Sequence, residues 1–168
     1  MYASITSLGQ DSHRFRTHEA RGPLRLAGID LDLGLELEGN SDADVVLHAI
    51  CNAISGLMGE PVLGLKADEI CAQGQRDSAV YLAYALERLR VLRPKLRLTH
   101  LSISIEALRP KLLEHFPAMR AAVAKQLNLD LNQVCITATT GEGMTGSGRG
   151  EGIAVLCILS AVDDLTLS

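Results

Sequence analysis

Residues 99–106, with the sequence THLSISIE, decide the fold class, because apolar and polar side chains alternate strictly along them. This period of two is typical of a β-strand with one face in the protein core. The stretches before and after it, at about residues 77–93 and 110–128, have the length and pattern of helices. We therefore expect a strand of a sheet that follows one helix and precedes another along the chain.

The two helices differ in their boundary signals. Asp77 is a typical N-cap for the first helix, and Pro94 ends it, because the residue before a proline disfavours helical geometry. Pro117 is expected to interrupt the second helix. Residues 133–139 and 153–162 then predict two more strands, joined by a glycine-rich loop.

The N-terminal half begins with two further β segments. Residues 1–8 are expected to form a short strand, and residues 23–38 a hairpin, since apolar and polar residues alternate there. A helix over residues 42–58 follows, and Ser41 and Asp44 form a capping-box-like start for it.

Residues 62–75 lack a regular pattern and are expected to be irregular. The predicted order is therefore β-β-α-α-β-α-β-β. It favours an α/β (α+β) two-layer sandwich, in which helices pack on a mixed β-sheet. The 168 residues suffice for one domain with its own core, so we expect a single domain over residues 1–168.

Composition narrows the functional classes. Hydrophobic residues make up 47% of the chain and charged residues 21%, which is typical of a soluble globular protein. Aromatic residues reach only 3% and the net charge is −4, so we expect no nucleic-acid partner. No signal peptide is evident, and the late apolar run Ile153–Val162 is too short to span a membrane. The four cysteines fit buried reduced thiols, so we expect a cytoplasmic protein.

Asp11 and His13 are candidate metal ligands, because residues two apart on an extended segment point to the same side. His48 on the first predicted helix is a candidate third ligand. Asp44 lies one turn earlier and is expected to hold the His48 ring by a hydrogen bond. One aspartate and two histidines leave a fourth position open, as in catalytic zinc sites. From spacing alone, a structural role for the histidines remains the alternative.

The glycine-rich loop, TTGEGMTGSGRGEG at residues 139–152, is a second candidate site. Its glycines match G-x-G-x-x-G, but a strand rather than a helix follows, which excludes a dinucleotide fingerprint. The loop could be a flexible hairpin connection. It could also bind phosphates and a divalent ion, with Glu142 holding magnesium against a diphosphate.

These segments together contain several ordered motifs: D-x-H near the start, S-D-A-D-V-x-x-H-A, R-P-K-L before H-F-P-A-M-R, A-T-T-x-E, and G-R-G-E-G-I-A. The chain resembles the 2-C-methyl-D-erythritol 2,4-cyclodiphosphate synthase family of the non-mevalonate isoprenoid pathway. The resemblance covers nearly the whole length, and the ordered set is more specific than any single motif.

The resemblance implies a homotrimer with active sites between neighbouring subunits. It implies zinc on Asp11, His13 and His48, and magnesium or manganese on Glu142. It also implies a pocket for the cytidine of a CDP-linked substrate, lined by Pro110, Lys111, Leu112, Ala138, Thr139 and Thr140. In the family reaction the 2-phosphate attacks the β-phosphate of the CDP group, CMP leaves and a cyclic diphosphate forms.

The resemblance further implies catalytic roles for Glu142, Thr140 and Ser41, with Ser41 holding a phosphate oxygen. Arg149 and Glu151 match family residues near the trimer axis, where a cavity can hold an isoprenoid diphosphate.

Several positions depart from the family pattern. They are Asn40, Asn52, Val62, Gly143, Gly146 and the segment 60–70, which replaces the family's substrate lid. The sequence leaves three hypotheses open. The first is a working synthase whose rebuilt lid uses Lys66, Asp68 and Glu69. The second is a divergent homologue with zinc, a cytidine site and another substrate, and the third is a non-enzymatic binding protein.

Overall fold

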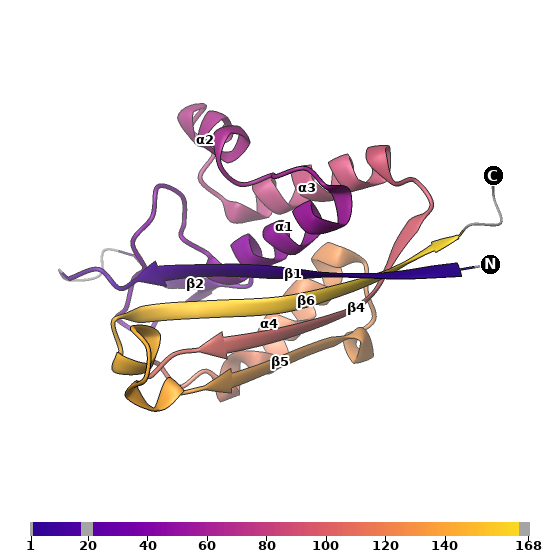
Figure 1. Cartoon of the computed structure of the whole chain (residues 1–168). Coiled ribbons are helices and arrows are strands. Elements are labelled where there is room, and N and C mark those ends of the chain that lie inside the picture. The colour runs from indigo at the N-terminus through magenta and orange to yellow at the C-terminus, as the bar shows by residue number, and fades with distance from the viewer. Residues whose placement is uncertain (1, 18–21, 165–168) are drawn as a thin grey trace.

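A four-stranded mixed sheet forms one layer of the protein (Figure 1). In this computed structural model, residues 2–17 and 22–164 are described, except for the side chains of residues 65–68 and 164. The strand order is β1-β6-β4-β5, and only the β4–β5 pair is parallel. The strands are β1 (Tyr2–Arg14), β4 (Leu96–Glu106), β5 (Val134–Thr139) and β6 (Gly152–Asp164).

The helices form the second layer, against one face of the sheet (Figure 1). They are α1 (Val45–Met58), α2 (Leu65–Ala72), α3 (Ser78–Leu92) and α4 (Phe116–Leu127). Four 3-10 turns connect the elements: η1 (Leu113–His115), η2 (Leu131–Gln133), η3 (Gly141–Gly143) and η4 (Ser147–Arg149). The predicted two-layer sandwich is therefore confirmed.

A separate hairpin of β2 (Leu24–Leu26) and β3 (Ile29–Leu31) packs beside the start of α1. Its two-residue turn, Ala27 and Gly28, has positive φ at both positions, as tight hairpin turns require. The hairpin predicted within residues 23–38 is confirmed, although its strands are shorter than the alternating pattern suggests.

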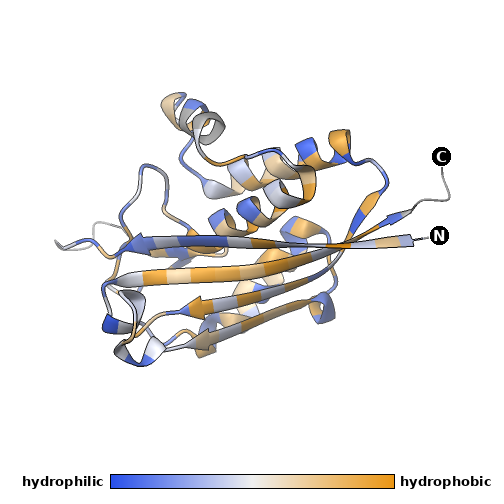
Figure 2. Ribbon diagram, in the orientation of Figure 1, coloured by the Kyte–Doolittle hydropathy of each residue, from blue (hydrophilic) through white to orange (hydrophobic). Residues whose placement is uncertain are grey.

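Side chains alternate across the sheet between the core and an uncovered face. On β4 and β6 the odd-numbered residues from Leu101 to Ile105 and from Ile153 to Ala161 are buried. The even-numbered residues point away from the helices, and this face exposes Leu8, Leu156 and Ile158. Figure 2 shows the strongly hydrophobic residues along β6. The outer face is thus partly apolar, although none of the described helices covers it.

Three local predictions were wrong for identifiable reasons. The segment 62–75 contains α2, a helix of eight residues, which are too few to show a helical period in the sequence. Pro117 lies in the first turn of α4, which begins at Phe116, rather than interrupting a longer helix, because proline fits the first helical turn where no N–H is needed. The N-cap of α1 is Asp44, whose carboxylate accepts from the N–H groups of Val46 and Leu47, so α1 starts later than predicted.

The first strand extends to Arg14, which is further than predicted, and α1 packs closely against it. Gly9 is buried at this contact. A Cβ atom at Gly9 would lie 1.9 Å from the Ala49 carbonyl oxygen and 2.6 Å from the Ala53 nitrogen. The strand and the helix therefore approach each other so closely that only glycine fits.

We expect Gly9→Ala to destabilise the protein, because the added methyl group overlaps backbone atoms of α1 that cannot move independently. Overpacking of this kind costs about 1–3 kcal/mol. Gly22→Ala is the control, since a Cβ there meets no atom within 4 Å. Urea unfolding measures both variants, and equal midpoints would show that α1 and β1 tolerate a wider separation.

Candidate active site

Strand β1 and helix α1 bring Asp11, His13 and His48 together. Asp11 and His13 alternate with outward-facing residues on β1, so both face α1. Asp11 Oδ2 lies 3.0 Å from His13 Nε2 and 3.0 Å from His48 Nδ1. The two histidine nitrogens are 3.2 Å apart. The three predicted ligands thus converge on one point.

This triad fits a zinc ion. Two ligand atoms that each lie about 2.0–2.1 Å from a tetrahedral zinc are about 3.3 Å apart. The observed separations of 3.0, 3.0 and 3.2 Å are close to that value. A carboxylate and two imidazoles are also suitable donor types. The site can therefore receive a metal with little rearrangement.

Asp11 and the histidines of the triad each favour the charged form of the other. Burial acts to raise the pKa of Asp11, but the two neighbouring histidines outweigh it and hold the pKa below its usual range. The hydrogen bond to Asp11 raises the pKa of His13, against the opposing effect of burial. An ionised Asp11 is thus ready to bind a cation.

The two imidazole rings are oriented by hydrogen-bond partners of the nitrogens that face away from the centre of the triad. His13 Nδ1 lies 2.6 Å from the Glu38 carbonyl oxygen, which leaves its Nε2 directed to the centre of the triad. His48 Nε2 lies 2.9 Å from the Ser78 hydroxyl and 3.3 Å from the Ser41 hydroxyl. Ser78 was missed in the sequence because it reaches the site from α3, thirty residues away along the chain.

The predicted hydrogen bond from Asp44 to the His48 ring is wrong. The Asp44 carboxylate instead accepts from the backbone N–H groups of Ala27, Gly28, Val46 and Leu47. It is fully buried and ties the β2–β3 turn to the start of α1. The spacing argument failed because an N-cap side chain turns back to its own helix N-terminus rather than along the helix face.

A cavity of about 220 Å³ opens in front of the triad. Besides the triad it is lined by Asn40, Ser41, Leu63, Gly64, Cys71 and Tyr81. Ser41 therefore lies where it could contact a phosphate bound near the metal. Three of the lining residues, Leu63, Gly64 and Cys71, belong to the stretch that follows α1 and includes α2.

The altered lid positions have structural roles. Val62 is buried in the core, and its N–H donates to the Ser55 hydroxyl. Asn52 donates to the Gln10 carbonyl and so joins α1 to β1. The predicted roles of Lys66 and Asp68 lie outside the described side chains.

A second cavity, of about 520 Å³, lies at the ends of β4 and β5. All six residues predicted for the nucleotide pocket line it: Pro110, Lys111, Leu112, Ala138, Thr139 and Thr140. Thr139 ends β5, and Pro110 to Leu112 follow β4. Because β4 and β5 are parallel, their C-terminal ends meet at one edge, which explains why segments distant in sequence share this pocket.

Glu142 lies just beyond this pocket, at a non-glycine position with φ of 49°. Its carboxylate accepts a hydrogen bond of 2.7 Å from the Thr140 hydroxyl. Glu142 is exposed, so its other lone pairs are accessible to a cation. The predicted pair of Thr140 and Glu142 is therefore brought together next to the predicted nucleotide pocket.

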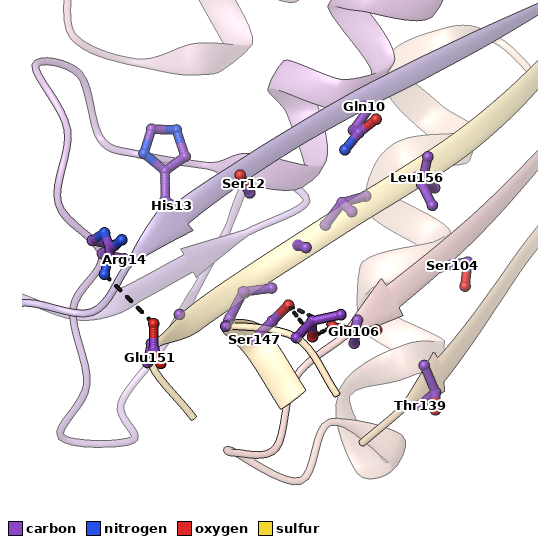
Figure 3. A pocket seen from close by; sticks show the side chains of 16 residues that line it. Gln10, Ser12, His13, Arg14, Ser104, Glu106, Thr139, Ser147, Glu151 and Leu156 are labelled. Carbon is purple, nitrogen blue, oxygen red and sulfur yellow. Dashed lines mark hydrogen bonds and ion pairs between the residues drawn. The ribbon is translucent and has the colours of Figure 1, made fainter. Parts of the chain in front are cut away.

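The glycine-rich loop is anchored by Glu106 at the end of β4. Glu106 accepts hydrogen bonds from the hydroxyls of Thr145 and Ser147, and these bonds lower its pKa (Figure 3). A Cβ at Gly141 would lie 2.7 Å from the Glu106 carboxyl carbon. Sequence reasoning missed Glu106, although a charged residue at the C-terminal end of an alternating strand was a visible signal.

A third cavity, of about 540 Å³, lies on the uncovered face of the sheet (Figure 3). Its lining includes Glu106, Glu151 and Arg14, and Arg14 lies 3.6 Å from Glu151. The predicted axial residues are adjacent, since Arg149 Nε donates to Glu151 at 2.9 Å.

Comparisons with known proteins agree with this geometry. The chain matches the YgbB family over residues 5–162. It is 45% identical over 157 residues to a Chlamydia muridarum protein named 2-C-methyl-D-erythritol 2,4-cyclodiphosphate synthase, covering 93% of this chain and 86% of that protein.

Two solved structures share the fold. The bifunctional IspDF from Campylobacter jejuni is 27% identical with a TM-score of 0.81, and the match covers 98% of this chain but only 43% of that one. The Plasmodium falciparum IspF CDP complex is 20% identical with a TM-score of 0.78, and the match covers 96% of this chain and 97% of that one.

We expect His48→Ala to abolish stoichiometric zinc binding, because it removes one of three convergent ligands. His100→Ala is the matched control, since His100 lies on β4 away from the triad. Inductively coupled plasma mass spectrometry on protein purified with zinc and then desalted gives the ratio of metal to chain. An unchanged ratio in His48→Ala would remove His48 from the ligand set.

Zinc affinity should also fall with acidity. The folded pKa of His13 lies above its ordinary value of 6.5, so protons compete with the metal as pH drops through that raised value. Asp11 stays ionised throughout this range because its pKa is depressed. A chelator titration between about pH 5 and about pH 8 should show tight zinc binding only at the upper end of this range. A flat profile would show that His13 is not a ligand.

Proposed function

The chain belongs to the YgbB family, and from this premise we propose that it is a 2-C-methyl-D-erythritol 2,4-cyclodiphosphate synthase. It would be a phosphorus–oxygen lyase of isoprenoid biosynthesis. Its reaction would convert 4-diphosphocytidyl-2-C-methyl-D-erythritol 2-phosphate to the 2,4-cyclodiphosphate and CMP. The observation that carries the proposal is the 45% identity to a named synthase across 93% of the chain.

Metal dependence is part of the proposal. The donor set of Asp11, His13 and His48 suits zinc, and exposed Glu142 beside the nucleotide pocket suits magnesium or manganese. When bound, these ions would neutralise phosphate charge and align the reacting groups. The substrate provides its own nucleophile, so the chain needs no nucleophilic side chain.

The remaining work of the chain is positioning. The pocket around Pro110, Lys111 and Leu112 would hold the cytidine, with Thr139 and Thr140 near the diphosphate. Ser41 faces the triad cavity and would donate its hydroxyl to an oxygen of the 2-phosphate. Fixing both ends of the substrate favours in-line attack on the β-phosphate, since orientation alone can supply a large part of catalysis.

We also propose a homotrimer whose active sites lie between subunits. The triad is on β1 and the nucleotide pocket is beside β5, and these strands are opposite edges of the sheet. Three strand spacings separate the edges, about 14 Å in all. A neighbouring copy could bring its nucleotide pocket next to this triad. The exposed Leu8, Leu156 and Ile158 on the uncovered face would then be buried between copies.

In such a trimer the cavity on the uncovered face would lie towards the axis. Glu151 lines this cavity and Arg149 donates to Glu151. These are the residues we propose for an isoprenoid diphosphate, with Arg149 as the phosphate contact. We propose one domain over residues 1–168, because a single hydrophobic cluster contains residues from Phe15 to Ala161.

Among the described residues, no helix combines the length and apolar character that crossing a membrane requires. We propose a cytoplasmic location on separate grounds. All four cysteines are free, although Cys71 is half-buried and Cys135 is exposed, so only Cys51 and Cys157 are buried as predicted. Free thiols of this kind persist in a reducing compartment.

The rebuilt lid is compatible with the synthase hypothesis. Helix α2 and the loop before it provide a wall for the triad cavity, although the family's lid motif is absent. No feature of the described residues favours a different substrate or a purely binding role.

Purified protein with zinc, magnesium and 4-diphosphocytidyl-2-C-methyl-D-erythritol 2-phosphate should release CMP and the cyclic diphosphate in equal amounts, as followed by phosphorus NMR. The His48→Ala protein is the negative control. No turnover by folded, zinc-loaded wild-type protein would exclude this substrate and overturn the proposed function.

A further inference from the structure

A chain of hydrogen bonds runs from the back of the His48 ring to Asp42. His48 Nε2 lies 2.9 Å from Ser78 Oγ, and Ser78 Oγ donates in turn to Asp42 Oδ1. Ser78 is completely buried, and it is the first residue of α3. The N-cap of this helix is Asp77, so the Ser78 hydroxyl is not occupied with capping.

Donors hold the Asp42 carboxylate in place. Its Oδ2 accepts the Ser78 backbone N–H at 3.0 Å and lies 3.2 Å from Arg25 Nε. Its Oδ1 accepts the Asp44 N–H at 3.3 Å. The first N–H groups of a helix and a guanidinium both favour negative charge. Both oxygens of Asp42 are therefore used as hydrogen-bond acceptors.

The direction of each proton follows from this end of the chain. An ionised carboxylate only accepts hydrogen bonds, so the Ser78 hydroxyl must donate to Asp42. The Ser78 oxygen then has only lone pairs to offer the His48 ring, so it can only accept a hydrogen bond from that ring. The proton of His48 is therefore on Nε2. Nδ1 then carries a lone pair and faces Asp11 Oδ2 at 3.0 Å. Two electron-rich atoms at this distance repel each other unless a cation lies between them.

We propose that Ser78 and Asp42 are positioning residues that set the His48 tautomer in which Nδ1 is free to bind the metal. This inference rests on the metal site proposed above. The Ser41 hydroxyl, at 3.3 Å from the same Nε2, is the weaker partner by distance and stays available to the substrate. Removing the Ser78 hydroxyl would leave the ring free to turn and to place its proton on Nδ1.

The test compares three variants with the wild-type chain. Ser78→Ala removes the hydroxyl, Ser78→Thr keeps it, and Asp77→Ala removes the N-cap of the same helix. Asp77 lies 3.6 Å from Arg25 Nη2, but Asp77→Ala leaves the Ser78 hydroxyl and the Asp42 carboxylate in place. Zinc affinity is measured by competition with a chromogenic chelator, and the His48 tautomer by nitrogen-15 NMR of the ring. Loss of a group that orients a metal ligand typically weakens the metal affinity about 10–100-fold.

We expect Ser78→Ala to bind zinc about 10–100-fold more weakly than wild type, and Ser78→Thr and Asp77→Ala to stay within about threefold of wild type. A merely structural role would instead lower thermal stability in Ser78→Ala and Asp77→Ala alike and leave zinc affinity unchanged. Equal zinc affinity of Ser78→Ala and wild type would overturn the relay.

Asp42→Asn is the second variant if Ser78→Ala does not fold. It keeps the side-chain volume but removes the charge that fixes the hydroxyl direction, so it should also weaken zinc binding. Wild-type affinity in Asp42→Asn would count against the relay. Failure of the wild-type chain to bind zinc would overturn the metal site itself, which separates the two proposals.

Discussion

The close contact between β1 and α1 is the constraint on which the candidate site depends. Gly9 allows the helix backbone to lie directly on the strand, and the same contact brings His48 to Asp11 and His13 two and four residues further along β1. An aspartate carboxylate and two imidazoles then meet at the spacing that zinc requires. A shift of the helix by a methyl group's width would change the distances of His48 Nδ1 from both Asp11 and His13.

The regular parts of this architecture could be predicted because they follow from local patterns. Alternation identified β4, short stretches of strand-forming residues indicated β5 and β6, and Asp77 marked the start of α3. Helix α2 escaped because its eight residues are too few to show a helical period. Asp44 was misassigned because i, i+4 spacing describes residues inside a helix, whereas an N-cap side chain folds back on the backbone.

The site itself was only partly visible in the sequence. Asp11 and His13 are two residues apart on one strand, and His48 lies on the next long helix. Spacing could therefore suggest these three ligands. Ser78 could not be found this way, because it contacts His48 from a segment thirty residues away. Glu106 gave a signal as a charge at the end of an alternating strand, but its partner Ser147 lies on a distant segment. Tertiary contacts of this length leave no periodic trace in the sequence. The placement of the triad cavity and the nucleotide pocket at opposite sheet edges became apparent only from the strand order.

The most direct test of the account is anomalous diffraction at the zinc edge from crystals of the zinc-loaded protein. The account predicts one strong peak per chain, at about 2.0–2.1 Å from Asp11, His13 Nε2 and His48 Nδ1. A fully occupied peak elsewhere, or no peak in protein that contains one zinc per chain in solution, would contradict it.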